Sequence, residues 1–231
     1  MSRILAPAVL ACLAISPAAG APRRAAPPTA ASIEAAAGGG ARDDDPSLIA
    51  KAEILLDRAH VSPGEIDGAA GDNFRGALGA FQETRGLAPS GELDAETWRA
   101  LAGDASQPVL KTYTISAADE AAPFTKSIPA RLEDMARLPG LSYTGALAEL
   151  AEKFHMSPGL MRALNPRADF ARAGTEIVVA DVPDMALRPG RRAVEVAPPP
   201  TPDSGPVAQT IVIDKPGRNL RVYDRDGRFL A

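Results

Sequence analysis

The chain has 231 residues, a net charge of −4 with acidic and basic residues interspersed, and only 4% aromatic residues. It has no long basic stretch, which excludes the electrostatic signature of a nucleic-acid-binding protein. With 22 prolines and 20 glycines, the composition predicts small modules joined by linkers rather than one large core.

The first 21 residues have the pattern of an export signal. Arg3 precedes an apolar run from Ile4 to Ile15, and small residues follow up to Ala21. The run is shorter than the ~20 residues that span a bilayer, so we interpret residues 1–21 as a cleaved signal peptide. The mature chain is expected to have no transmembrane span and to lie in the periplasm or cell envelope.

Cys12 is the only cysteine of the sequence and lies inside this signal pattern. Val9 to Cys12 weakly resembles a lipoprotein box, so lipidation of Cys12 is a second interpretation. If the signal is removed without lipidation, the mature chain contains neither a thiol nor a disulfide. Cysteine chemistry is therefore not expected in the mature chain.

Residues 22–45 are rich in alanine, proline and glycine, which predicts a disordered linker. The acidic run that closes the linker suits a helix N-terminus better than a calcium site. Asp45 can cap the helix, and Pro46 can take its first position. A helix is therefore expected to begin at residue 46.

Helical periodicity predicts three short helices between residues 46 and 103. Apolar residues recur at helical spacing from Leu48 to Ala59, again from Phe74 to Phe81, and once more at Trp98 and Leu101. These helices predict a minimal three-helix bundle.

The same segment resembles the peptidoglycan-binding repeat of bacterial wall enzymes. The resemblance is carried by Ile66-Asp67-Gly68, Gly71, Phe74 to Gln82, Arg85-Gly86-Leu87, Gly91 to Asp94 and Thr97 to Leu101. It implies that residues 46–103 bind peptidoglycan, with Asp67, Asn73 and Gln82 as candidate contacts. For Gln82, a side chain that bonds the loop backbone instead of a ligand is an equally good interpretation.

Residues 109–182 predict the order strand, helix, helix, strand. The strands are the β-branched runs Lys111 to Ile115 and Glu176 to Ala180. Between them, two helices with apolar faces follow Thr144 and Ser157-Pro158, where Thr144 is expected to be the N-cap of the first.

This second segment resembles a LysM module. The resemblance is carried by Ala148 to Phe154, Met156-Ser157, Leu160, Leu164-Asn165-Pro166, Ala173-Gly174-Thr175 and Ile177-Val178-Val179. It implies a groove for N-acetylglucosamine-containing glycans between the loops after the first strand and after the second helix, with Asn165 and Pro166 as candidate contacts. Residues 117–142 replace the family's short connection on the rim of this groove. This insertion is expected to extend the glycan site, to block it, or to pack against a neighbouring catalytic domain.

Residues 183–208 contain a proline-rich run and predict an extended spacer. From residue 209 the pattern is that of a β-hairpin, with strands at Ile211 to Ile213 and Leu220 to Tyr223 and a turn signal at Asp226-Gly227. This pattern resembles the opening of the L,D-transpeptidase catalytic domain, which cross-links peptidoglycan stem peptides through a cysteine. The resemblance implies that residues 209–231 are the truncated start of that domain.

No catalytic residue is identified. The transpeptidase reaction needs a cysteine thiolate and a histidine, and the only histidines, His60 and His155, end helices in different predicted modules. Two isolated histidines without a mature thiol do not form a zinc site, and the sequence has no phosphate-binding loop. Neither a metal nor a cofactor is expected, and the chain alone is expected to be inactive as an enzyme.

The predicted fold is an α+β multi-module chain: a three-helix bundle, a βααβ module and an incomplete β-hairpin, with a disordered N-terminus and disordered linkers. The predicted function is that of the exported targeting region of an L,D-transpeptidase, with peptidoglycan as partner through its glycan strand, its stem peptide or both. Two alternatives stay open. In the first, the chain is a complete non-catalytic wall adaptor. In the second, it is the targeting region of another peptidoglycan-processing enzyme.

Overall fold

The computed structural model describes residues 26–38, 44–103, 107–138, 140–183, 207–215 and 219–230. The predicted signal peptide, Cys12 and most of the proline-rich spacer lie outside these ranges. Within the described ranges, no helix is long and apolar enough to cross a membrane.

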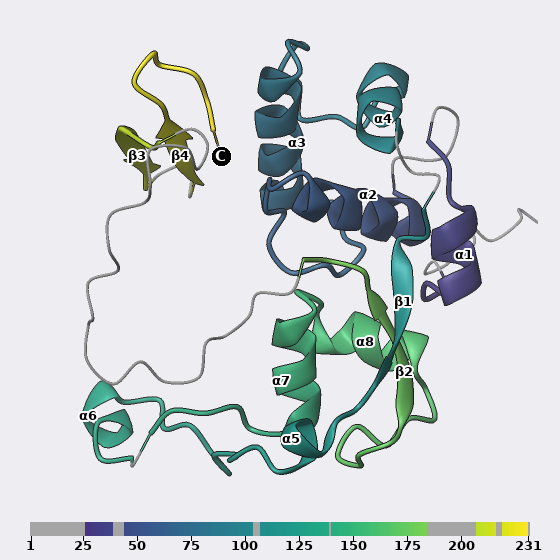
Figure 1. Ribbon diagram of the computed structural model, residues 1–231, viewed down its shortest axis with the longest axis vertical. Coiled ribbons are helices and arrows are strands. Elements are labelled where there is room, and N and C mark those ends of the chain that lie inside the picture. Colours follow the sequence, from purple (N-terminus) through teal and green to yellow (C-terminus); the bar gives the residue numbers. More distant parts are fainter. Residues whose placement is uncertain are drawn as a thin grey trace, which may run out of the picture.

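The described residues form helices and two small antiparallel sheets, which agrees with the predicted α+β class (Figure 1). In chain order the elements are α1 (Ala30–Ala35), α2 (Pro46–Arg58), α3 (Asp72–Thr84), α4 (Ala95–Ala102), β1 (Leu110–Thr114), α5 (Ala117–Glu120), α6 (Leu132–Met135), α7 (Ala146–Lys153), α8 (Pro158–Leu164), β2 (Glu176–Ala180), β3 (Thr210–Asp214) and β4 (Asn219–Tyr223).

Helices α2, α3 and α4 occupy the segment in which three helices were predicted. Asp45 caps α2 by accepting from the Ser47 amide at 2.9 Å, and Pro46 takes the first helical position. Asp94 caps α4 by accepting from the Thr97 amide at 2.7 Å. Such caps satisfy amides that have no partner within the helix, so they determine where each helix begins.

The segment predicted to be a disordered linker is partly folded onto the bundle. Residues 30–35 form α1, and its Ile33 is 0% exposed. Lys51 Nζ donates to the carbonyls of Glu34 and Ala36 at 2.7 and 2.9 Å. The prediction of disorder is therefore wrong for this helix, because burial of Ile33 and these polar contacts offset the entropy that an alanine-rich chain loses on ordering.

The βααβ module contains β1, α7, α8 and β2 in the predicted order. β1 and β2 pair antiparallel, with Tyr113 opposite Ile177. Ser157 caps α8 by accepting from the Leu160 amide at 3.1 Å. The N-cap of α7, however, is Gly145 without a side-chain hydrogen bond, so the predicted cap at Thr144 is wrong by one residue.

The insertion between β1 and α7 contains α5 and α6 and is anchored at its start by a polar cluster. Asp119 in α5 accepts from the Tyr113 hydroxyl at 2.6 Å and pairs with Lys153 at 3.0 Å. Burial disfavours the charged form of Asp119, but hydrogen bonds from Tyr113, Ser116 and Lys153 outweigh it and lower the pKa of this carboxyl to about 2. The cluster therefore joins α5 to both β1 and α7.

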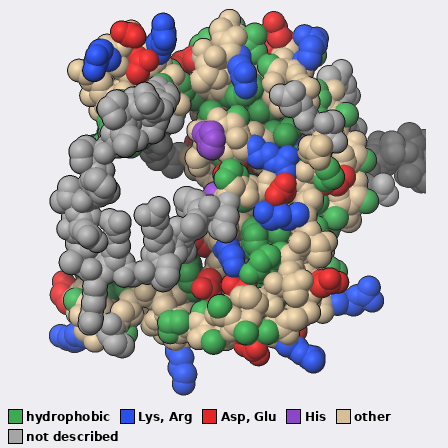
Figure 2. Space-filling model, viewed as in Figure 1, with side chains coloured by type: hydrophobic (Ala, Val, Ile, Leu, Met, Phe, Trp, Pro, Cys, Tyr) green, Lys and Arg blue, Asp and Glu red, His purple; other side chains and the backbone are tan. Residues whose placement is uncertain are grey.

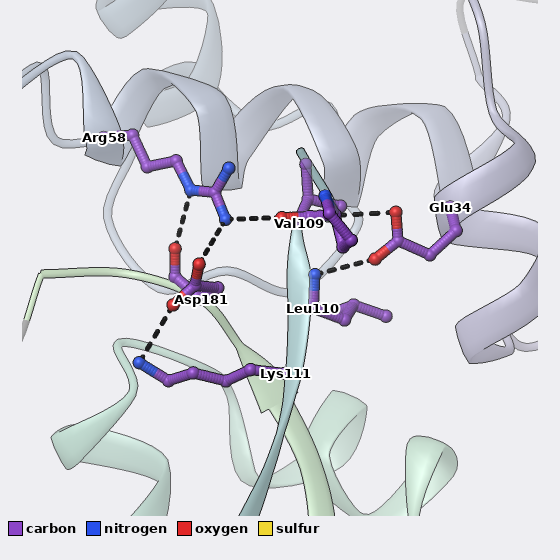
Figure 3. A network of polar contacts seen from close by, with 7 residues as sticks. Glu34, Arg58, Val109, Leu110, Lys111 and Asp181 are labelled. Atoms are coloured by element: carbon purple, nitrogen blue, oxygen red, sulfur yellow. Dashed lines mark hydrogen bonds and ion pairs between the residues drawn. The ribbon is translucent and has the colours of Figure 1, made fainter. Parts of the chain in front are cut away.

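The bundle and the βααβ module are docked together through Arg58, at the end of α2 (Figure 3). The Arg58 guanidinium donates to the Asp181 carbonyl at 2.7 Å, to the Asp181 carboxylate at 2.8 Å and to the Pro108 carbonyl at 2.8 Å. Lys111 pairs with the other Asp181 oxygen at 3.0 Å. One arginine thus holds both chain segments that flank the β1–β2 pair.

Two further contacts join the modules. The Glu34 carboxylate of α1 accepts from the amides of Val109 and Leu110 at 3.2 and 2.8 Å, at the start of β1 (Figure 3). Ile66 forms a parallel bridge with Met156. A single cluster of buried apolar residues runs through both modules. The modules therefore share one core and are not joined by a flexible linker alone.

β3 and β4 form an antiparallel hairpin, with Ile211 opposite Val222. On β3, Ile211 and Ile213 are 60% and 67% exposed, and Val212 between them is 45% exposed. Because neighbouring side chains of a strand point to opposite faces, β3 exposes apolar side chains on both of its faces. An ion pair of 3.5 Å joins Arg221 to Glu83 of α3.

Candidate functional site

A cavity of about 340 Å³ lies beside the loop between α2 and α3. Asp67 and Asn73, two of the predicted contact residues, line it together with Glu53 and Glu65. Asp67 and Asn73 are both exposed, so their side chains are accessible to a ligand. The structure therefore brings these two predicted residues to one site.

Local contacts constrain the loop that carries Asp67. The Asp67 carboxylate accepts from the Ala69 amide at 2.8 Å. Gly68 has φ +77°, and a Cβ there would lie 2.8 Å from the Pro46 carbonyl oxygen. A side chain at this position would be strained on both grounds, which explains the glycine after Asp67.

Glu53 supports this loop from the interior of the bundle. It is 1% exposed, and its Oε2 accepts from the amides of Asp67 and Gly68 at 3.0 and 2.9 Å. Burial raises the pKa of the Glu53 carboxyl to about 8, with the nearby Asp67 carboxylate adding to the rise and the two amides opposing it. At neutral pH this carboxyl is mainly protonated, which avoids a buried charge.

Sequence reasoning missed Glu53, although a signal was available. Ile49, Glu53 and Leu56 lie at positions i, i+4 and i+7 of α2, so they share one face of the helix, and all three are buried. A glutamate on a buried helical face needs polar partners. Here those partners are the amides of the loop.

Gln82 does not line the cavity. It is 1% exposed, its amide nitrogen donates to Ser90, Glu92 and Thr97 at 2.8–3.0 Å, and its oxygen accepts from Gly91 at 2.9 Å. The structure supports the interpretation in which Gln82 bonds the loop between α3 and α4. We therefore leave it out of the proposed ligand contacts.

A second hollow, the βααβ groove, has a volume of about 460 Å³ and lies between the start of α7 and the loop after α8. Asn165 and Pro166, the predicted contacts of this module, both line it. Asn165 is 8% exposed, and its amide bonds the Met161 carbonyl and both backbone groups of Val178 at 2.7–2.9 Å. Asn165 therefore shapes the loop, and Pro166 is exposed to a ligand.

The lining of the βααβ groove combines apolar and polar groups. Leu147 and Phe170 are half-buried, whereas Arg162 and Asp169 are exposed. The backbone at the start of α7 also faces this hollow, since Gly145 lines it and offers no side-chain cap. An apolar floor with a few polar groups at its edge is the usual make-up of a small-ligand site.

A comparison with protein families gives one match in the bundle. Residues 46–101 match the model described as "Putative peptidoglycan binding domain". The match begins at the first residue of α2, ends in α4, and contains every residue that lines the cavity with Asp67 and Asn73. Residues 46–101 form a peptidoglycan-binding domain. The predicted peptidoglycan partner is thereby supported, and the domain places the protein at the cell wall.

A comparison with curated proteins gives no match to the chain. The peptidoglycan-binding domain covers about a quarter of the residues. The match therefore concerns the binding function of this domain and does not by itself identify an enzymatic activity.

Proposed function

We propose that this chain is the exported targeting region of an L,D-transpeptidase, which holds the enzyme on the cell wall where cross-links are made. The observation that carries the proposal is the peptidoglycan-binding domain at residues 46–101, with Asp67 and Asn73 exposed in one cavity. The domain shares a core with the βααβ module. Two binding surfaces on one rigid unit engage a polymer with less loss of freedom than two tethered ones.

The βααβ module is proposed as a LysM-like glycan-binding module. Supporting features are the order β1, α7, α8, β2, the antiparallel pairing of its strands, and the βααβ groove at the positions that the resemblance implies. In this proposal the exposed Pro166 and the half-buried Phe170 contact the sugar ring. The insertion, residues 117–142, ends shortly before Gly145, which lines the groove, and in this proposal it extends the contact surface there.

The link to an L,D-transpeptidase rests on the residue pattern of the β3–β4 hairpin and on the order of the modules. Both faces of the hairpin expose apolar side chains, so the hairpin needs further structure packed against it. The single cysteine, Cys12, lies in the predicted signal peptide. The role proposed for the chain itself is therefore binding, and catalysis is assigned to a cysteine supplied elsewhere.

Sedimentation with purified peptidoglycan sacculi tests the binding function. The full chain is expected to pellet with the sacculi. A double variant, Asp67→Asn with Asn73→Ala, is expected to reduce the bound fraction about fivefold, because lost contacts of this kind cost about 1 kcal/mol. Glu96→Gln, on the exposed start of α4, is the matched control and should pellet normally. If the unaltered chain stays in solution, the targeting role is excluded.

A further inference from the structure

A third cavity, of about 430 Å³, lies where the peptidoglycan-binding domain meets the βααβ module. Asp57 of α2 and Glu152 of α7 line it, together with the residues that follow these helices: His60, Glu65 and His155. The two histidines line the same cavity although they are far apart in the sequence; histidine is purple in Figure 2, where one such side chain is plainly visible. We call this site the junction cavity.

Two copies of one short motif contribute residues to the walls of the junction cavity. Residues 60–64 read His-Val-Ser-Pro-Gly, and residues 155–159 read His-Met-Ser-Pro-Gly. Each histidine ends its helix in the left-handed region, with φ 61° for His60 and 55° for His155. The second copy is bonded to Ile66, which donates to the His155 carbonyl at 2.8 Å and accepts from the Ser157 amide at 2.9 Å. The junction cavity is thus preformed by backbone contacts between the modules.

His155, which lines this cavity, carries a buried ring nitrogen without a partner in the described part of the chain. Its Nδ1 lies 2.8 Å from the Asp57 carboxylate, and because an ionised carboxylate only accepts, Nδ1 carries the hydrogen. In the neutral ring, Nε2 is then an acceptor. Nε2 is buried and has no hydrogen-bond partner among the described residues. A buried polar atom in this state needs an explanation, and a ligand donor supplies one.

Glu65 and Glu152 add two further acceptors, one from each module. Both are exposed, and neither carboxylate has a hydrogen bond or an ion pair with any residue that the structure describes. Glu65 also lines the cavity that holds Asp67 and Asn73. The junction cavity therefore adjoins the proposed peptidoglycan site.

We propose that the junction cavity binds a primary ammonium group, with Glu65, Glu152 and His155 as its acceptors. An ammonium group has three donors and no acceptor, which matches three unpaired acceptors with a negative net charge. The inference rests on the proposed function only in placing this amine on peptidoglycan. Two sources share the chemistry: the diamino-acid side chain of a stem peptide, and a glucosamine unit that has lost its acetyl group.

Calorimetric titration of the full chain with four probes tests the ammonium site. The probes are a stem peptide with a free side-chain amine, the same peptide acetylated at that amine, a glucosamine oligomer, and an N-acetylglucosamine oligomer. We expect a free-amine probe to bind and its acetylation to weaken binding about tenfold, since a charge-assisted contact is lost. Tighter binding of the free-amine peptide assigns the site to the stem peptide, and tighter binding of the glucosamine oligomer assigns it to the glycan.

Two variants connect the effect to this cavity. Glu65→Gln and Glu152→Gln are each expected to weaken binding of the free-amine probe about fivefold, while Glu120→Gln, an exposed glutamate on α5, should leave it unchanged. All three positions are exposed, so the unfolding midpoint should stay within about 2 °C of that of the unaltered chain. Equal binding of amine and acetylated probes, or unaltered binding by both variants, overturns the proposal.

The sacculus assay separates this inference from the proposed function. If the unaltered chain pellets and the free-amine probes show no preference over the acetylated ones, the ammonium site is excluded while wall binding stands. If the chain does not pellet but binds a free-amine probe through Glu65 and Glu152, wall binding is excluded while the ammonium site stands.

Discussion

The cavity of the peptidoglycan-binding domain and the βααβ groove are each supported by one buried polar side chain, but of different kinds. Glu53 holds the amides of Asp67 and Gly68, whereas Asn165 holds both backbone groups of Val178. In each module one predicted contact, Gln82 or Asn165, is buried and bonds a loop, whereas the other predicted contacts are exposed. The two sites differ in how their support depends on pH, because the Glu53 carboxyl changes charge with pH and the Asn165 amide does not.

Removal of the Glu53 carboxyl is expected to have the largest effect. Glu53→Ala leaves two loop amides without an acceptor and creates a cavity in the bundle. The free energy of unfolding should therefore fall by about 3–4 kcal/mol. Urea unfolding measures this loss. Glu53→Gln keeps an acceptor of similar size and should cost less than half as much. Equal losses for both variants would show that the loop does not depend on this acceptor.

The second prediction uses the pKa of Glu53. This pKa is about 8 in the folded chain, above its ordinary value of 4.5, so the folded state keeps a proton that the unfolded state has released. The free energy of unfolding should therefore fall as the pH rises from about 5 to about 8, by on the order of 3 kcal/mol. Glu53→Gln should remove this dependence. A pH profile identical for the variant and the unaltered chain would contradict the prediction.

In the βααβ groove, the matching experiment is Asn165→Ala. The change leaves the Met161 carbonyl and the Val178 backbone groups without their partner, so unfolding should require about 2 kcal/mol less. Thermal denaturation followed by circular dichroism measures the change, which should be the same at pH 5 and pH 8. Pro166→Ala is the control beside it and should shift stability by less than about 0.5 kcal/mol.

Phe170→Ala tests whether the βααβ groove and the junction cavity bind different ligands. If the sugar ring packs on Phe170, the variant should bind an N-acetylglucosamine oligomer about fivefold more weakly, a loss of about 1 kcal/mol. Binding of the free-amine peptide should not change. Loss of both ligands together would mean that the two sites are not independent.

Arg58→Ala is expected to have the smallest effect, because the Arg58–Asp181 pair is partly exposed. The loss should be about 1 kcal/mol, and the more informative result is the shape of the transition. If Arg58 holds the modules together, urea unfolding should become less cooperative. Lys111→Ala removes the other contact of Asp181 and is the matched comparison; it should leave cooperativity unchanged.

Sequence patterns predicted most of the elements because their causes are local. The caps Asp45 and Asp94 lie next to the helices that they start. The predicted cap at Thr144 fails by one residue, since Gly145 takes the position in extended backbone. Helix α1 was not predicted, because a single isoleucine in an alanine-rich run carries no periodicity; its burial depends on a surface formed by the rest of the chain.

The candidate site residues were predicted less completely. Asp67, Asn73 and Pro166 are exposed in hollows, as ligand contacts must be, whereas Gln82 and Asn165 are buried and bond the backbone. Residue type and spacing do not distinguish these two roles, because a polar side chain on a helix or in a loop can point inward or outward. Burial decides between them, and burial depends on what packs against the helix.

The sequence by itself determined the positions of α2, α3, α4, α7, α8 and the strands, the cap at Asp45, and the resemblance of residues 46–101 to a peptidoglycan-binding domain, which the family comparison supports. Only the tertiary structure decided that the two modules share one core, that Glu53 is a buried carboxyl with a raised pKa, and that His60 and His155 face one cavity. The physical reason is range. Caps and periodicity act within a few residues, whereas Arg58 and Asp181 are 123 residues apart, and contacts of that separation form only when the whole core packs.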